Sequence, residues 1–139
     1  MGAAFEILEH TADVGFHAWG ADAPELFVNA ARAMMAIAAE DSPVTEADER
    51  VIEVEGEDYP SLLVNWLSEL LYLFDSDEFV TGKIEVENIN ANHLRARLSG
   101  ESRDPARHRW KLIVKAVTYH GLEVKEIRDG WEARVFLDI

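Results

Sequence analysis

The sequence predicts an α+β fold in which two helices pack on antiparallel sheet. Two amphipathic segments with helical spacing lie within the first 75 residues, and most strand-like segments follow one another in the second half of the chain. At 139 residues and 48% hydrophobic composition, the chain can bury a core without disulfides or metal. We therefore expect one compact domain over residues 1–139.

The first half of the chain contains both expected helices. Strands are predicted at 5–9 and 14–19, where apolar residues alternate on either side of the interruption HTAD. A helix is predicted from Pro24 to the polar segment EDSP, with acidic residues near its start. The segment VIEVEG alternates as a strand, and Pro60 begins a second helix with a wide apolar face that ends near Asp75.

The second half is expected to form strands. The dipeptide Asp129-Gly130, between alternating segments, predicts a hairpin. The strand segments are GKIEVEN (82–88), HLRARLSG (93–100), WKLIVKAVTYH (110–120), LEVKEI (122–127) and the closing RDGWEARVFLDI (128–139).

Composition excludes several classes of protein. There is no cysteine, so the chain has neither disulfides nor thiolate metal ligands. No apolar run approaches the roughly 20 residues that span a bilayer, and the N-terminus does not resemble a leader, so we expect a soluble cytoplasmic protein with no membrane partner. Phosphate-binding glycine loops, HExxH and EF-hand patterns are absent, which argues against a nucleotide enzyme of a standard kind.

Charge is unevenly distributed along the chain. The net charge of −14 argues against a protein whose main task is to hold nucleic acid. Residues 95–115, however, contain seven of the 13 basic residues and only two acidic ones, a local charge of +5. We expect an electrically two-sided molecule. Within this window Arg103, Arg107 and His108 could grip a phosphate or an acidic partner, or could simply be solvated.

Three other clusters carry chemistry, each with a structural alternative. Asp13 lies in a break between strands, where its carboxylate could bind a cation or accept backbone N–H bonds in a turn. In KAVTYH, strand alternation puts Lys115 on the face of Val117 and Tyr119, and His120 on the opposite face with Thr118, an arrangement that suits a site or an edge strand. At the C-terminus, Asp138 and the α-carboxylate of Ile139 offer two hard oxygen groups, if the alternating apolar residues before them tie the end down.

Taken together, these clusters resemble the archease family of small acidic proteins that accompany an RNA ligase. The resembling stretches cover nearly the whole chain. They are HTADVG (10–15), ELFVNAARAM (25–34), WLSELLYLFD (66–75), RHRWKLIVKAVTYHGLEV (107–124) and the terminal DI.

The resemblance implies a strand-helix-strand-strand module that is not itself a catalyst. It implies an activator of the GTP-dependent ligase that joins RNA ends carrying a 2′,3′-cyclic phosphate or 3′-phosphate to 5′-hydroxyl ends in tRNA splicing and RNA repair. Such an activator promotes ligase guanylylation and multiple turnover, and would meet tRNA only through the ligase.

The same resemblance implies the site residues. A divalent cation, Ca²⁺ rather than Mg²⁺, would be held by Asp13, Asp138 and Ile139. His10, Lys115 and His120 would take part in activating the ligase.

Two alternatives stay open. A chaperone or adaptor of a tRNA methyltransferase would bind that enzyme without affecting ligation. A metal-dependent phosphohydrolase would use the same carboxylates to orient a water molecule and would turn over a phosphate ester with no partner present.

Overall fold

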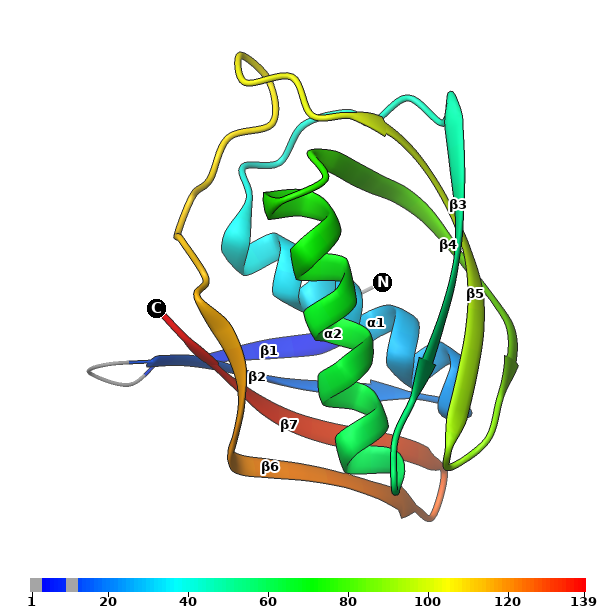
Figure 1. The fold of residues 1–139 in the computed structure, drawn as a ribbon. Helices are drawn as coiled ribbons and strands as arrows, with labels where there is room; N and C mark the ends of the chain where they lie inside the picture. The colour runs from blue at the N-terminus through cyan, green and yellow to red at the C-terminus, as the bar shows by residue number, and fades with distance from the viewer. Residues whose placement is uncertain (1–3, 10–12) are drawn as a thin grey trace.

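Seven strands and two helices make up the part of the chain that the structure, a computed structural model, describes: residues 4–9 and 13–139. They are coloured in chain order in Figure 1. The elements are β1 (Phe5–Glu9), β2 (Asp13–Gly20), α1 (Ala23–Ala38), β3 (Asp48–Glu55), α2 (Tyr59–Asp75), β4 (Phe79–Ile89), β5 (His93–Ser102), β6 (Ala116–Ile127) and β7 (Gly130–Asp138).

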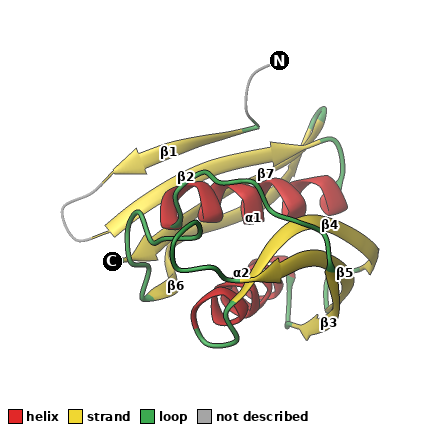
Figure 2. Cartoon of the chain, turned by 90° about the horizontal axis from the view of Figure 1, so that it is seen from above, coloured by secondary structure: helices red, strands yellow, loops and turns green. Residues whose placement is uncertain are grey.

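The strands form two antiparallel sheets with both helices between them. One sheet has the order β1-β2-β7-β6 and the other has the order β3-β5-β4. Helix α1 contacts β1, β2 and β7 of the first sheet and β4 of the second, while α2 contacts β6 and all three strands of the second sheet. Figure 2 shows this arrangement from above. The expected α+β class is confirmed, although the antiparallel strands divide into two sheets.

Both helices begin where the sequence predicts, because aspartate caps precede their prolines. Asp22 accepts a hydrogen bond from the Glu25 backbone N–H at 2.9 Å. Asp58 and Ser61 form a capping box, in which each side chain accepts the other residue's backbone N–H, at 2.9 and 3.1 Å. These bonds satisfy donors that a helix start otherwise leaves unpaired.

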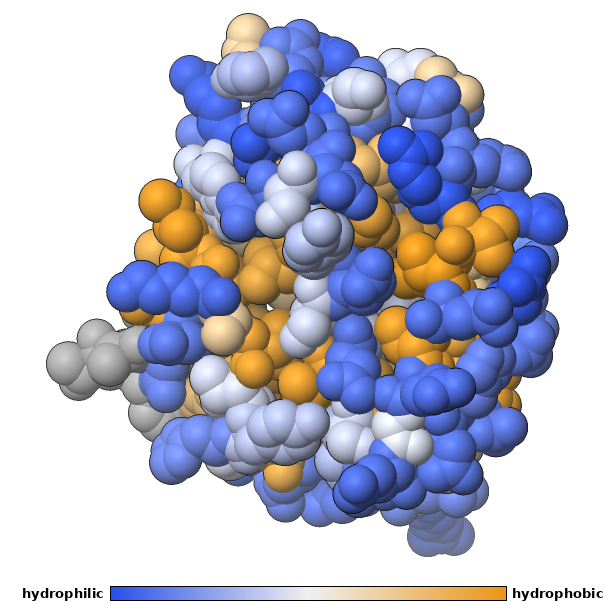
Figure 3. All heavy atoms as spheres, in the orientation of Figure 1, coloured by the Kyte–Doolittle hydropathy of each residue, from blue (hydrophilic) through white to orange (hydrophobic). Residues whose placement is uncertain are grey.

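A single apolar core joins the helices to both sheets. Trp66 is fully buried, and its indole N–H donates to the Phe27 carbonyl at 2.9 Å, so its one polar atom is satisfied. The hydropathy colouring of Figure 3 shows a largely hydrophilic face with apolar side chains towards its middle. In the described part of the chain, no helix is long and apolar enough to cross a membrane. The largest fully buried side chains are Trp66, Phe16, Phe27, Phe74, Phe79, Leu26 and Met34.

The predicted strand at 110–120 is wrong in its first half. Residues 111–115 are not strand, and Trp110 makes only an isolated bridge to Ala39. The reason is that the last carbonyls of a helix need donors. The Lys111 backbone N–H donates to the Ala38 carbonyl at 2.8 Å, so this backbone serves the end of α1 rather than a sheet.

The second half of that segment joins the next one in a single strand, β6, which contains a bulge. Its register against β7 shifts between Thr118 and Glu123. Within this stretch Tyr119, expected on the face of the buried Val117, is 61% exposed.

The predicted hairpin is confirmed with an offset of one residue. Arg128 and Asp129 form the turn, and Gly130 already pairs with Ile127. Gly130 has φ +151°, and a Cβ there would lie 2.3 Å from the Gly20 carbonyl oxygen. Glycine is required at this position because β7 starts in close contact with the end of β2.

Candidate metal and partner-binding site

The outer face of the four-stranded sheet, defined as the face that lies away from the helices, carries three of the expected site residues: Asp13, Asp138 and His120. Along β2, the alternate residues Val14, Phe16 and Ala18 are buried against the helices. Their neighbours His17 and Trp19 point the other way and are half-buried and exposed. The same alternation in β7 puts Asp138 on the outer face.

Strand register brings the two aspartates of the site together. Asp13 begins β2 and Asp138 ends β7, and the two residues are direct partners in the antiparallel ladder. Residues paired in this way have Cα atoms about 4.5–5.5 Å apart and side chains on the same face. The two carboxylates therefore share one end of the outer face.

The end of the chain is held in place. Asp138 pairs with Asp13 on one side and with Ala116 on the other. The side chain of Ile139 packs against the core. The predicted ordered C-terminus is confirmed, and the terminal carboxylate follows directly after Asp138.

Lys115 lies beside the same strand end. Its backbone N–H donates to the Asp138 carbonyl at 2.7 Å. Its side chain is exposed and forms no ion pair within the described part of the chain. The lysine backbone is thus fixed beside Asp138, while the ammonium group is available to a partner.

His120 lies on the outer face, on the side of β6 that alternation from Thr118 predicts. Its ring lies 6.3 Å from the ring of Phe136, measured between centroids. Phe136 comes two residues before Asp138 on the same face of β7. His10, which the sequence also assigned to this site, lies outside the described residues.

The donor set fits a hard divalent cation. Asp13, Asp138 and the terminal carboxylate of Ile139 offer only oxygen atoms, the ligands that Ca²⁺ and Mg²⁺ prefer. Among the described residues, no three side chains of His, Cys, Asp or Glu form a group that could hold a metal. The proposed set differs from such a group because its third donor is the chain terminus. Ca²⁺ takes about six to eight oxygen ligands, so water or a partner would have to complete the shell.

Arg103, Arg107 and His108 lie elsewhere, in the segment that connects the two sheets. Arg103 is mostly buried, stacks over the ring of Phe74 at 5.0 Å and lies 3.6 Å from Glu78. His108 is only 3% exposed. In this structure both side chains are engaged internally, and Arg107 is the more exposed member of the group.

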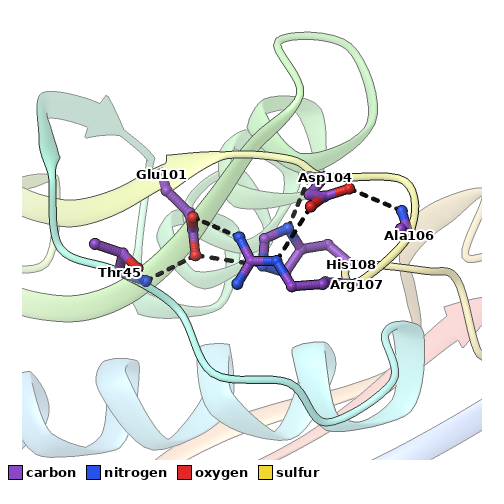
Figure 4. Close-up of polar contacts among 6 residues, drawn as sticks. All are labelled: Thr45, Glu101, Asp104, Ala106, Arg107 and His108. Atoms are coloured by element: carbon purple, nitrogen blue, oxygen red, sulfur yellow. Dashed lines mark hydrogen bonds and ion pairs between the residues drawn. The ribbon is translucent and has the colours of Figure 1, made fainter.

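A polar network organises this segment (Figure 4). Glu101 accepts the Thr45 backbone N–H at 2.7 Å and the Arg107 guanidinium at 2.9 Å. These two bonds, the Thr45 bond first, hold the pKa of the Glu101 carboxyl below its ordinary value. Asp104 accepts the Ala106 backbone N–H at 2.9 Å and Arg107 at 3.2 Å, which lowers its pKa in the same way.

The buried His108 joins the network through Nδ1. Nδ1 of His108 accepts the Asp104 backbone N–H at 2.8 Å, so the neutral ring carries its proton on Nε2. Nε2 lies 3.4 Å from a carboxylate oxygen of Glu101. Arg107 and His108, which the sequence offered as a docking surface, thus contact Glu101 of β5, and Glu101 in turn binds the loop after α1.

The expected positive face is not formed by the arginines of the 95–115 window. Each of its five arginines lies within 4.0 Å of a carboxylate, and for two of them strand order is the reason. Arg95 and Arg97 on β5 are flanked by Glu53 of β3 and Glu87 of β4. The other pairs are Arg103–Glu78, Arg107–Glu101 and Arg109–Glu40.

Phe136, Gly15 and Gly121 surround the site but were not singled out from the sequence. The available signal was a lone glycine within each strand pattern, which often marks the close approach of another group. What approaches is the Phe136 ring, whose atoms lie against both glycine α-carbons.

The chain matches the Archease protein family (MTH1598/TM1083) over residues 5–139. A protein archease from Methanosarcina mazei is 43% identical over 143 aligned residues, which cover 100% of this chain and 98% of that protein. A protein archease from Pyrococcus furiosus is 39% identical, with 97% of this chain and 98% of that protein covered.

Two solved structures have the same fold. Protein 1598 of Methanobacterium thermoautotrophicum, solved in solution, superposes with a TM-score of 0.80 at 37% identity and covers 99% of this chain and 100% of its own. A crystal structure of an archease from Thermotoga maritima, described as a possible chaperone, gives a TM-score of 0.64 at 19% identity, covering 95% and 94%. The second likeness is evidence for the fold alone.

Replacing Glu101 by Gln should lower the melting temperature at pH 7, because the network loses the negative charge that Glu101 places beside Arg107. The folded-state pKa of Glu101 is depressed, so its contribution is fully present above the unfolded-state pKa of about 4.3. The contribution is lost as pH falls through the folded-state pKa. The gap in melting temperature between wild type and Glu101→Gln should therefore close in acid. The exposed Glu46→Gln is the matched control, and a gap that stays constant with pH would contradict this account.

Proposed function

The chain belongs to the archease family, and we propose that it is a non-catalytic activator of the GTP-dependent RNA ligase that seals 2′,3′-cyclic phosphate or 3′-phosphate ends to 5′-hydroxyl ends. The observation that carries the proposal is the direct pairing of Asp13 with Asp138, with Lys115 hydrogen-bonded to the same residue. This arrangement brings the carboxylate oxygens of two aspartates and Lys115 to one end of the sheet. It suits an element that is presented to another protein's active site.

Asp13, Asp138 and the carboxylate of Ile139 would hold a divalent cation, with Ca²⁺ favoured over Mg²⁺. When bound, the cation would supply positive charge that stabilises phosphate oxygens. The two aspartates lie at the ends of paired strands, so their positions are set by the sheet rather than by a mobile loop.

Lys115 would contribute a second, fixed positive charge. Its backbone is bonded to Asp138, while its exposed ammonium is free of ion pairs within the described residues. A lysine ammonium is a compact charge that binds phosphate as a point donor. Lys115 is thus suited to contact the partner or its nucleotide next to the bound cation.

The charge of the whole chain favours a protein partner over RNA. At −14 the molecule repels a polyanion, whereas a basic ligase surface would attract it. We therefore propose that tRNA is reached only through the ligase.

The deciding experiment is a ligation assay with limiting ligase, GTP and divalent metal, with and without this protein. We expect faster guanylylation and a gain in turnovers per ligase. Stable binding to a tRNA methyltransferase with no effect on ligation would favour the adaptor role. Turnover of a phosphate ester by the chain alone would favour a phosphohydrolase.

Asp13→Asn should weaken Ca²⁺ binding about tenfold or more, because the site loses a charged ligand. A tenfold loss corresponds to about 1.4 kcal/mol of binding free energy. A short flexible tag after Ile139 should weaken it too, since the tag converts the terminal carboxylate to an amide. Both effects are measured by calorimetry and by ligase guanylylation.

An N-terminal tag is the control for the C-terminal one. Melting temperature without metal should change little in all three proteins, because no core side chain is altered. Equal Ca²⁺ affinity for both tagged forms would remove Ile139 from the ligand set, and wild-type affinity in Asp13→Asn would remove the aspartate.

Lys115→Ala should reduce guanylylation by the ligase, and Lys115→Arg should restore it only in part, because a planar guanidinium places its charge differently from an ammonium. Lys111→Ala is the control, since Lys111 is also exposed and lies in the same connecting segment. Full activity of Lys115→Arg would show that only the charge at this position matters.

A further inference from the structure

Phe136 is buried on the outer face of the sheet, the side away from α1 and α2. It is 7% exposed, although its neighbours on the outer face of β7, Arg134 and Asp138, are exposed. A Cβ built on Gly15 would lie 2.6 Å from Cδ1 and Cε1 of Phe136, and one built on Gly121 would lie 2.8 and 2.9 Å from Cε2 and Cδ2. One edge of the ring therefore lies on β2 and the opposite edge on β6.

The bulge of β6 is built around this ring. The register of β6 shifts between Thr118 and Glu123, and Gly121 within that stretch has φ +68°, a conformation that glycine adopts without strain. A side chain at Gly121 would meet the ring as well as the unfavourable φ. The ring and the left-handed glycine thus fit each other, and the residue before that glycine is His120.

Thr118 gives a second link between the same strands. Its hydroxyl donates to the Phe136 carbonyl at 3.2 Å and accepts the His120 backbone N–H at 3.3 Å. The imidazole of His120 lies 6.3 Å from the Phe136 ring, with the two planes 58° apart. The backbone of His120 is therefore linked to Phe136 through Thr118, and the ring of His120 lies near the Phe136 ring.

Phe136 and its neighbours lie next to the pair of aspartates, Asp13 and Asp138. Gly15 is paired with Phe136, and the next pair on the same face is Asp13 with Asp138. On the other side Thr118 pairs with Phe136, and Ala116 pairs with Asp138. The ring is thus the layer of the outer face that adjoins the two aspartates.

We infer that Phe136 and Thr118 are positioning residues that hold His120 on the outer face next to Asp13 and Asp138. The inference rests on the proposed function, because it assigns a purpose to His120 at that site. Phe136 acts through packing on two glycines and Thr118 through two hydrogen bonds. Neither side chain needs to touch the ligase or a metal.

The test uses Thr118→Val, which removes the hydroxyl but keeps the shape, and Thr118→Ser, which keeps the hydroxyl. Phe136→Leu removes the ring, and Trp19→Leu is the matched control on the outer face of β2 at its far end. Three properties are measured for each full-length variant: melting temperature, NMR signals of the histidine rings, and ligase guanylylation. The His120 signals are assigned by their loss in His120→Gln, and His93 in the other sheet is the internal reference.

Thr118→Val and Phe136→Leu should shift the His120 ring signals, leave those of His93 unchanged and reduce activation about tenfold, the lower end of the loss expected when an orienting group is removed. Thr118→Ser should restore both properties, and Trp19→Leu should alter neither. If Phe136→Leu fails to fold, the comparison of Thr118→Val with Thr118→Ser tests the inference.

Unmoved His120 signals in folded Thr118→Val would overturn the inference, as would moved signals with undiminished activation. Failure of the wild-type protein to stimulate the ligase would instead refute the proposed function. In that case the ring signals still report whether Thr118 and Phe136 position His120.

Discussion

The pairing of β7 with β2 on one side and β6 on the other is the constraint on which the site depends. Because β7 is an inner strand of its sheet, its last residue, Asp138, has partners on both sides, Asp13 and Ala116. Antiparallel register thereby assembles an N-terminal aspartate, a C-terminal aspartate and the residue after Lys115 in one row. A terminus held by two ladders can serve as a ligand, whereas chain ends are ordinarily poorly ordered.

The same principle of register governs the charges on the other sheet. Arg95 and Arg97 lie close together in sequence and suggest a basic patch, yet β5 is the middle strand and acidic residues of β3 and β4 flank it. A count of charges along the chain includes only sequence neighbours, while a sheet brings together segments that are distant in sequence. The positive charge left beside the candidate site is that of Lys115, at the junction of the two sheets.

The outer face shows how a sheet can shape a site on the side that neither α1 nor α2 covers. Glycines at Gly15 and Gly121 weaken their strands individually, because they have no side chain to pack. Here the missing side chains make room for Phe136, which fills the space from β2 to β6. His120 lies on the same face as Thr118 and Phe136, with its ring 6.3 Å from the Phe136 ring.

The sequence by itself determined the fold class, both helices and the hairpin near Gly130, because these depend on local periodicity and turn chemistry. The combination of Asp13 with the chain end as a candidate site came from the family resemblance of the motifs. Only the tertiary structure decided that residues 111–115 serve the end of α1, that β6 is one bulged strand, that Arg103 and His108 are engaged internally, and that Phe136 lies between two glycines. Apart from the contacts of His108 with Asp104 and Glu101, these features depend on contacts between residues far apart in the chain, which the periodicity of either segment does not reveal.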